Sequence, residues 1–450
     1  MSTVFGTDGI RGVANAQLRP EIALALGRAA ARHLGSTAFL VGRDTRHSGP
    51  MLLSALGAGI AAEGFDVVDV GVIPTPGLAW LGATRNLPVA MVSASHNPFR
   101  DNGIKLFGPG GTKLSPDVER VIERDLNALL QGSEISVLPV PVGRDVGNLL
   151  IDDHAGVTYI EDLASGVSLS KGRRPRVVCD CANGAASTLA PALFGRLGID
   201  AVFIANTPDG TNINDHCGAT APHLLGQTVL REGADLGLSF DGDADRLIAC
   251  DRFGNIIDGD VLLALFAFDL DDRSLLLDHR VVTTVMSNRG LVRALGERGI
   301  SVIETGVGDR NVTDAMDLNG AVLGGEQSGH IVFRRKVLIG DGMYSALRLI
   351  ELVTRSDDDL AELASRALTR MPQVVHNVVV DDPSQLEAHP AIFARAASLE
   401  PSLGSWGRIY IRASGTEQRV RIMVEGEDVE QVRQVVDDLI EVVEREMAHR

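Results

Sequence analysis

The sequence repeats one pattern three times: an apolar strand, a helix, and a second strand entered through a glycine. Written as strand, helix and strand, the copies are 38–42, 51–63 and 66–72; 176–181, 187–197 and 201–205; and 280–286, 291–297 and 301–305. Such a unit places its two strands in parallel, because parallel strands need a long crossover connection. Three copies spaced about a hundred residues apart therefore predict three similar α/β domains with mixed sheets.

A different pattern follows Pro372, where the sequence predicts a strand, a helix, two strands and a final helix. Apolar side chains recur at helical spacing from Val429 to Met447, which predicts a core-facing side of the last helix. A chain of 450 residues is also too long for one hydrophobic core. We therefore expect four domains, which are α/β domains at 1–152, 153–253 and 254–370 and an α+β domain at 371–450.

The charge balance of the chain limits the partners it can bind. Acidic side chains outnumber basic ones by 59 to 42, which gives a net charge of -17. No block of lysines or arginines interrupts this negative field, so the sequence predicts neither a nucleic-acid nor an anionic-membrane partner. An anionic substrate would have to be held by a few well-placed arginines and backbone amides.

The start of the chain and its cysteines indicate the cellular compartment. The opening MSTVFGTDGIRG lacks the basic and apolar stretches of a secretory signal, and the apolar run at 261–268 is too short to span a bilayer. Four cysteines in 450 residues fit reduced thiols better than a disulfide framework. The sequence therefore predicts a cytoplasmic protein.

A short polar loop follows the strand expected at 89–92. It reads Ser-Ala-Ser-His-Asn-Pro, residues 93–98, and an Asp-Asn-Gly turn follows at 101–103. Small hydroxyls and an Asn-Pro pair form a tight turn where a buried strand emerges. By itself, this stretch is explained by a turn whose polar side chains form hydrogen bonds with the backbone of the same turn.

Three aspartates alternate with small residues directly after the strand expected at 236–240. Asp241, Asp243 and Asp245 would converge there and repel one another unless a cation lies among them. An EF-hand loop is excluded, because arginine stands at both the sixth and the twelfth place, where glycine and glutamate are needed. Oxygen ligands favour Mg²⁺ or Ca²⁺ over zinc, so we predict a magnesium site open to a phosphate ligand.

Two further loops offer groups that bind sugars and phosphates. The loop at 324–330, Gly-Gly-Glu-Gln-Ser-Gly-His, could form hydrogen bonds with adjacent sugar hydroxyls. A turn whose polar groups bond to one another explains the same residues equally well. The loop at 412–416, Arg-Ala-Ser-Gly-Thr, offers a guanidinium, two hydroxyls and consecutive amides, which together make a nest for phosphate. Arg419 and Arg421 add positive charge that a plain hairpin turn would not need.

Taken in order, the motifs FGTDGIRG, SASHNP, DGDADR, GEQSGH and RASGTE resemble those of the α-D-phosphohexomutase superfamily. The resemblance extends from residue 5 to the 420s. It implies a cytoplasmic isomerase with four domains around a central cleft. Within the superfamily, the chain is most similar to the bacterial enzymes that interconvert glucosamine 6-phosphate and glucosamine 1-phosphate, on the way to the amino-sugar nucleotide used in cell-wall building.

The resemblance also implies a reaction through a phosphoserine and a sugar 1,6-bisphosphate, which serves as activator, with one Mg²⁺ per chain. The implied catalytic residues are Ser95, Lys105, His330 and Arg11, the implied metal ligands are Ser95, Asp241, Asp243 and Asp245, and the implied binders of sugar and distal phosphate are Glu326, Ser328, Arg412, Ser414, Gly415, Thr416 and Arg421. Lys105 is the expected base, because a desolvated lysine near other cations gives up its proton more readily.

Other activities remain open from the sequence. Gln418 stands where the superfamily commonly has a proline in the distal phosphate loop, so the identity of the sugar is less fixed than the chemistry. A phosphomannomutase or phosphoglucomutase is one alternative, and a magnesium-dependent sugar phosphatase is another. A sensor without catalysis would need neither Ser95 nor the three aspartates. The expected partners are small hexosamine phosphates, and the resemblance allows a homodimer.

Overall fold

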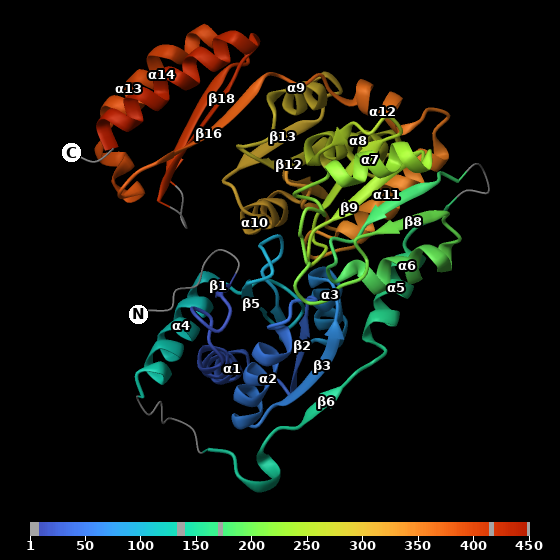
Figure 1. Ribbon diagram of the computed structural model, residues 1–450, viewed down its shortest axis with the longest axis vertical. Helices are drawn as coiled ribbons and strands as arrows, with labels where there is room; N and C mark the ends of the chain where they lie inside the picture. Colours follow the sequence, from blue (N-terminus) through green and yellow to red (C-terminus); the bar gives the residue numbers. More distant parts are fainter. Residues whose placement is uncertain (1–8, 133–139, 170–173, 414–417, 448–450) are drawn as a thin grey trace. The chain divides into compact units, whose positions relative to one another are not determined.

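A computed structural model of the chain describes residues 9–132, 140–169, 174–413 and 418–447 (Figure 1). The chain divides into two compact units, of which the first comprises Met1–Val285 and Ile303–Ser365, and the second Met286–Val302 and Arg366–Arg450. The described residues form four sheets, which agrees with the four predicted domains. Within these residues, no helix is both long and apolar enough to cross a membrane.

The first sheet is mixed, with strand order β1-β5-β4-β2-β3-β6. Its elements are β1 (Ile10–Val13), α1 (Pro20–Leu34), β2 (Ala38–Arg43), α2 (Gly49–Ala62), β3 (Asp66–Val72), α3 (Thr75–Arg85), β4 (Val89–Val92), β5 (Asp101–Phe107), α4 (Pro116–Leu130) and β6 (Leu149–Ile151). Strand β2 pairs in parallel with β3 and β4, whereas β5 runs antiparallel to β1 and β4. Alternate strand residues pack against α1, α2 and α4 on one face and against α3 on the other (Figure 1).

The second sheet has the order β11-β10-β9-β7-β8 and is also mixed. Its elements are α5 (Ala155–Ser165), β7 (Val177–Asp180), α6 (Ala186–Leu197), β8 (Ala201–Ile204), α7 (His223–Glu232), β9 (Leu236–Phe240), β10 (Leu247–Asp251) and β11 (Ile256–Ile257). Strand β7 is parallel to β8 and β9, and β10 is antiparallel to β9 and β11. Strand β11 thus joins this sheet although it follows residue 253.

The third sheet has the order β13-β12-β14-β15. Its strands and the helices of this part of the chain are α8 (Gly259–Asp272), β12 (Arg280–Thr284), α9 (Arg289–Glu297), β13 (Ser301–Thr305), α10 (Asp309–Asn319), β14 (Leu323–Gly325), β15 (Ile331–Phe333), α11 (Gly342–Arg355) and α12 (Leu360–Ala367). Strand β14 is parallel to β12 and forms an antiparallel hairpin with β15. The two strands of the third predicted repeat, β12 and β13, are therefore neighbours in this sheet, and α9 connects them in sequence.

A glycine with positive φ precedes the second strand in each of the three repeats. The φ angles are 89° at Gly64, 64° at Gly198 and 74° at Gly299. A left-handed residue ends a helix and redirects the chain, and glycine adopts this conformation without steric cost. These glycines therefore permit the turn from each crossover helix into the second strand of its repeat.

The second unit contains an antiparallel sheet of order β16-β18-β17, which α13 and α14 cover on one face (Figure 1). Its elements are β16 (Gln373–Val379), α13 (Pro390–Leu399), β17 (Arg408–Ala413), β18 (Arg419–Glu425) and α14 (Val429–Met447). Val432, Val436 and Leu439 of α14 are buried against this sheet, as the helical spacing predicts. Helix α9 joins the unit through the amide of Arg289, which donates to Glu425 Oε1 at 2.6 Å.

The loops after β2 and β4 meet because parallel neighbouring strands end at the same edge of a sheet. Arg46, in the loop after β2, is fully buried and donates to four backbone carbonyls between Ser95 and Asp101 at 2.5 to 2.9 Å. Its Nε also pairs with Asp44 at 2.8 Å. This buried ion pair therefore fixes the shape of the loop at 93–98.

We predict that Arg46→Met loosens this loop. The change leaves the buried carboxylate of Asp44 uncompensated, at a cost of roughly 3–5 kcal/mol. We expect a lower urea midpoint and faster hydrogen–deuterium exchange in peptides that cover 93–101. The matched control is Arg28→Met, which removes an ion pair to Glu63 with a side chain 29% exposed and should cost less than about 1 kcal/mol. Equal effects of the two changes would contradict the role assigned to Arg46.

Candidate active site

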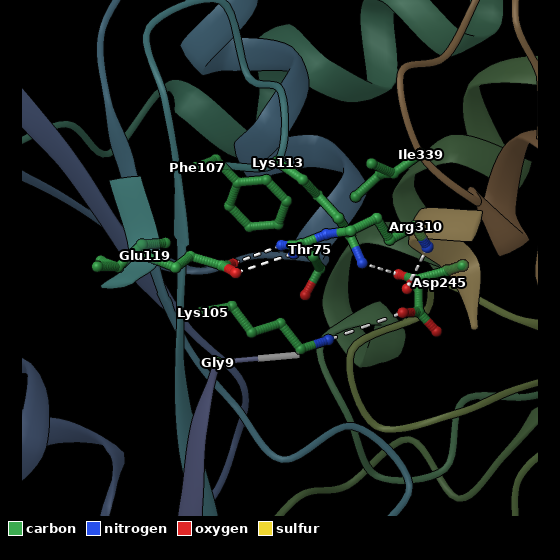
Figure 2. A pocket seen from close by; sticks show the side chains of 11 residues that line it. Gly9, Thr75, Lys105, Phe107, Lys113, Glu119, Asp245, Arg310 and Ile339 are labelled. Carbon is green, nitrogen blue, oxygen red and sulfur yellow. Dashed lines mark hydrogen bonds and ion pairs between the residues drawn. The ribbon is translucent and has the colours of Figure 1, made fainter. Parts of the chain in front are cut away.

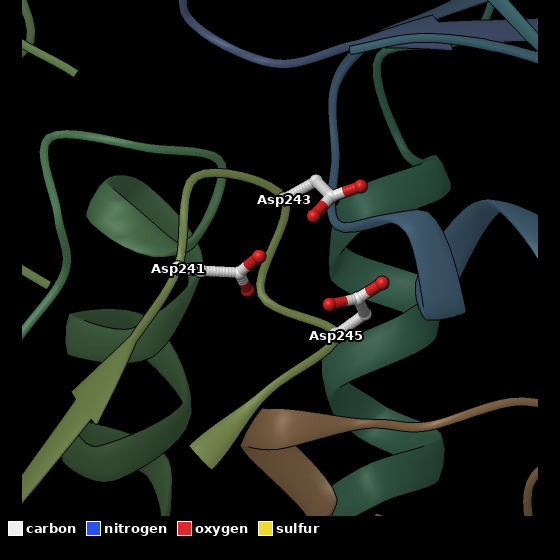
Figure 3. Close-up of side chains that lie close together, drawn as sticks. All are labelled: Asp241, Asp243 and Asp245. Carbon is white, nitrogen blue, oxygen red and sulfur yellow. The ribbon is translucent and has the colours of Figure 1, made fainter. Parts of the chain in front are cut away.

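Three aspartates follow β9 and direct their carboxylates toward one common space (Figure 3). Asp241, Asp243 and Asp245 are all buried, and one oxygen from each lies within 4.8 Å of the others. Ala244, between the last two, has a φ of 55°, so the loop is held in a conformation that is costly for a residue with a side chain. The convergence predicted from the sequence is therefore present.

The electrostatics of this cluster fit a divalent cation. Burial, together with the charges of Asp245 and Asp243, raises the pKa of Asp241 well above its ordinary range. Within the described chain, Oδ1 of Asp243 and Oδ1 of Asp245 are buried without a hydrogen-bond partner. A cation bound among these oxygens would satisfy them and relieve the repulsion, and a set of carboxylate ligands suits Mg²⁺.

The hydroxyl of Ser95 points at the cluster, and Ser95 Oγ donates to Asp241 Oδ2 at 2.5 Å. Ser95 is 2% exposed and has a φ of 51°, which is strained for a residue other than glycine. Its carbonyl accepts from Arg46 at 2.8 Å and from Asn214 Nδ2 at 2.9 Å, and its amide donates to Ser93 Oγ at 2.9 Å. These bonds hold the strained turn that aims the hydroxyl at the aspartates.

His96 lies beside Ser95, with Nδ1 3.2 Å from Ser95 Oγ. Burial, together with the positive charges of Arg246 and Arg11, lowers the pKa of His96 to about 4. The imidazole is therefore neutral at pH 7, and the two guanidinium groups place positive charge near the serine. His96 is not among the residues predicted from the sequence, although its place next to Ser95 in the motif was a usable signal.

Lys105, on β5, lines a pocket next to the aspartates (Figure 2). Its Nζ lies 2.9 Å from Asp243 Oδ2 and 3.8 Å from Asp245 Oδ2. The sequence predicts other cations near this lysine, and the structure places two carboxylates beside it. In the same pocket, Arg310 forms an ion pair with Glu119.

His330 is buried and uses both ring nitrogens. Its Nδ1 lies 3.7 Å from Asp245 Oδ2, and its Nε2 accepts a hydrogen bond from the Gly340 amide at 3.0 Å. Burial lowers the pKa of His330, but the nearby negative charge, that of Asp245 first and then those of Asp309 and Glu326, outweighs it and raises the value to about 9. Protonation at Nε2 would break the bond from Gly340. A Cβ at Gly340 would lie 2.6 Å from the ring, so only glycine permits this approach.

The loop between β14 and β15 carries the two residues expected to contact the sugar. Glu326 Oε1 accepts from the Gly308 amide at 3.1 Å, and Ser328 Oγ is buried without a partner among the described residues. The Leu247 amide at the start of β10 donates to the Gly329 carbonyl at 3.0 Å. The backbone therefore brings this loop to the strand that directly follows the aspartates.

The arginines expected to hold the distal phosphate lie in the second unit. Arg412 on β17 and Arg421 on β18 are direct cross-strand partners, and Arg421 Nε donates to Asn377 Oδ1 at 2.9 Å. Like charges directly opposite each other destabilise a sheet unless an anion lies between them, which suits a phosphate clamp. The other members of this predicted loop, Ser414, Gly415 and Thr416, lie outside the described residues.

The first unit thus brings together a set of side chains from three of the four predicted domains. They are Arg11, Ser95, Lys105, Asp241, Asp243, Asp245, Glu326, Ser328 and His330. Thr75 was not predicted as a site residue, yet its amide and its hydroxyl both donate to Asp243, at 3.0 and 2.6 Å, across 168 positions of sequence. Asn214 and Arg46 were not predicted either, because no local pattern indicates which distant loop such a side chain reaches.

Comparison with family models gives a match along nearly the whole chain. The α/β/α domains I, II and III of phosphoglucomutase/phosphomannomutase match residues 2–132, 157–254 and 258–371, and the C-terminal domain matches 376–442. The phosphoglucosamine mutase of Desulforamulus reducens is 45% identical over 98% of this chain and 99% of its own length. That of Rhodococcus jostii is 44% identical over 98% of each chain.

Solved structures show the same architecture. A phosphoglucomutase/phosphomannomutase family protein from Burkholderia thailandensis aligns with a TM-score of 0.84 at 27% identity, covering 99% of this chain and 98% of that one. N-acetylphosphoglucosamine mutase from Aspergillus fumigatus, solved with GlcNAc-6P and magnesium, aligns with a TM-score of 0.72 over 99% and 96% of the two chains, and at 17% identity it shows the fold alone. The predicted four-domain α/β architecture with mixed sheets is confirmed. This chain is an isomerase that belongs to the phosphoglucomutase/phosphomannomutase family, within the α-D-phosphohexomutase superfamily.

Proposed function

We propose that this protein is a phosphoglucosamine mutase, which interconverts glucosamine 6-phosphate and glucosamine 1-phosphate in the cytoplasm. The observation that carries the chemistry is the contact of 2.5 Å between Ser95 Oγ and Asp241, inside a buried cluster of three carboxylates. The choice of sugar is supported by curated relatives named phosphoglucosamine mutase, which are 44–46% identical over 98% or more of this chain. Hexosamine phosphates are the proposed substrates.

In the proposed cycle, Ser95 carries a phosphoryl group. The free hydroxyl of the sugar monophosphate attacks that phosphorus and gives its proton to a nearby base. The bond from phosphorus to Ser95 Oγ breaks, and Ser95 Oγ takes up a proton. The product is a sugar 1,6-bisphosphate. After the sugar turns over, Ser95 Oγ attacks the other phosphorus, loses its proton, and the released sugar oxygen is protonated. Phosphate is thus moved between two sugar positions with no net transfer to water.

The residues around Ser95 have distinct proposed roles in this cycle. Asp241, Asp243 and Asp245 would hold Mg²⁺, which when bound supplies positive charge opposite the phosphoryl oxygens. Arg11 adds positive charge on the side of His96, as the lowered pKa of that histidine indicates. Lys105 is held by Asp243 and Asp245, two of the carboxylates that would bind the metal, so its ammonium group lies beside the proposed metal site.

Turning the intermediate over requires binding groups away from the reacting phosphorus. We assign the non-reacting phosphate to Arg412 and Arg421, with Ser414, Gly415 and Thr416 in the loop between them. Glu326 and Ser328 would contact the sugar, since a buried hydroxyl without a partner gains a hydrogen bond from a sugar hydroxyl. His330 orients Asp245 in the described geometry, and its role as a proton carrier stays a prediction.

We predict that Ser95→Ala lowers the isomerisation rate by more than about a thousandfold, because it removes the group that carries phosphate. Binding of glucosamine 6-phosphate, measured by calorimetry, should be retained, since the sugar and distal phosphate contacts remain. Ser398→Ala, an exposed change on α13, is the matched control and should keep full activity. Near-normal turnover by the Ser95 variant would place the nucleophile elsewhere.

We predict that Asp243→Asn weakens Mg²⁺ binding by at least about tenfold, because one of three charged ligands becomes neutral. Calorimetric titration of the purified protein with MgCl₂ measures this affinity without any turnover. Asp437→Asn, on the exposed side of α14, controls for the loss of one charge in the chain. Unchanged affinity in the Asp243 variant would show that the metal does not bind at this cluster.

Initial rates on three sugars test the substrate. We expect faster conversion of glucosamine 1-phosphate than of glucose 1-phosphate or mannose 1-phosphate, with release of inorganic phosphate far slower than isomerisation. A preference for mannose 1-phosphate would make the protein a phosphomannomutase. Release of inorganic phosphate at the rate of substrate loss would make it a phosphatase.

A further inference from the structure

A cavity of about 150 Å³ lies between α8, β15 and α11, in the third sheet's part of the first unit. It lies at the opposite end of the β14–β15 hairpin from the loop with Glu326 and His330, because Phe333, which lines it, pairs with Leu323 at the hairpin's open end. The residues of the proposed reaction do not line this cavity. It is therefore a second candidate binding site.

The lining of this cavity is mostly apolar or aromatic, and all of its charged side chains are positive. Five of its nine lining residues are apolar or aromatic, and the other four are Arg273, Arg335, Lys336 and Arg348. Among the described residues, no carboxylate lines it, although the chain as a whole has a net charge of -17. A pocket with this composition suits a ligand that has an apolar body and a negative group.

Three of the four cations are held by carboxylates that do not line the cavity. Arg273 pairs with Asp269 at 3.2 Å, Lys336 with Asp162 at 2.7 Å, and Arg348 with Glu351 at 2.5 Å. These ion pairs fix the directions of the cationic side chains. They leave the cavity itself without a bound negative group.

Arg335 differs from the other three cations. It is exposed, and its side chain makes no hydrogen bond or ion pair within the described part of the chain. An arginine with free donors at the edge of an apolar cavity can bind a carboxylate or phosphate with two parallel hydrogen bonds.

The cavity also contains a polar group that the protein leaves unsatisfied. Tyr344 is 6% exposed and packs its ring edge-on against Phe333, with ring centroids 5.3 Å apart. Its hydroxyl has no hydrogen-bond partner among the described residues. Tyr344 lines the cavity and its hydroxyl is not among the fully buried polar atoms, so it can donate to a ligand there.

We propose that this cavity binds a small organic anion built on an apolar ring. The ring would pack against Phe333, Val322 and Leu270, the anionic group would pair with Arg335, and the Tyr344 hydroxyl would donate to it. A carboxylate and a phosphate ester share this chemistry. This cavity is separate from the candidate active site for sugar phosphates. Its proposed ligand binding does not depend on which sugar the active site converts.

The test uses 4-(trifluoromethyl)benzoate as the probe and fluorine NMR of the full-length protein as the readout. We expect saturable binding that Arg335→Gln weakens by about fivefold or more, the size of one partly exposed ionic contact. Tyr344→Phe should also weaken it, because the ring stays and only the donor is lost. Arg231→Gln, with a side chain 64% exposed on α7, is the matched control and should leave the affinity unchanged.

Two further arms separate this site from the candidate active site and from apolar binding alone. Saturating glucosamine 6-phosphate should not displace the probe, and the uncharged 4-(trifluoromethyl)benzamide should bind more weakly. The proposal is overturned by the absence of saturable binding, by equal affinity of the wild type and the Arg335 variant, or by displacement with the sugar phosphate. If the wild-type protein isomerises glucosamine phosphates, the proposed mutase activity stands whether or not the probe binds at this cavity.

Discussion

The structure of the site depends on the repulsion among three buried carboxylates. Asp241, Asp243 and Asp245 lie too close together to be charged at once without cations nearby, and burial increases the cost. Lys105 supplies one positive charge, and the guanidinium of Arg246 supplies another. His330, whose pKa is raised to about 9, lies beside Asp245 as well. The pKa of Asp241 is nevertheless raised by burial and by its two neighbouring carboxylates, so repulsion persists where Ser95 presents its hydroxyl, and a divalent cation with a phosphate ligand would relieve it.

The serine loop and the aspartate loop are placed in the same way, each directly after a strand of its sheet. Ser95 follows β4 and Asp241 follows β9, so both lie at the carboxyl ends of strands in mixed sheets, where loops are free to carry function. The buried pair of Arg46 and Asp44 then fixes the serine loop from a third strand end, that of β2. A strained turn persists only when its surroundings hold it in place. The Arg46 guanidinium does this for the turn at Ser95 by binding four backbone carbonyls of the loop.

Much of this could be predicted from the sequence, because the informative signals are local. Strand β4 at 89–92 and strand β9 at 236–240 have the predicted bounds, since apolar runs end where polar motifs begin. The aspartate triplet follows from its spacing. Family membership and the isomerase class follow from five motifs in order, and the comparisons confirm both. The roles of the individual site residues stay predictions.

What the sequence could not provide is the set of contacts between distant loops. Thr75 meets Asp243 and Asn214 meets Ser95 across more than a hundred positions, and neither side chain stands in a distinctive pattern. The contacts of Lys105 with Asp243 and Asp245 are of the same kind, because these carboxylates come from another predicted domain. Single-chain patterns indicate which groups a loop offers, whereas packing decides which groups meet.

The central claim is that Ser95 carries a transferable phosphoryl group beside the aspartate cluster. Mass spectrometry of the intact protein, before and after incubation with glucose 1,6-bisphosphate and Mg²⁺, followed by peptide mapping, tests it most directly. The account predicts the added mass of one phosphoryl group, located on Ser95 and lost on exposure to excess glucosamine 6-phosphate. An active enzyme that carries no phosphate, or that carries it on another residue, would contradict the account.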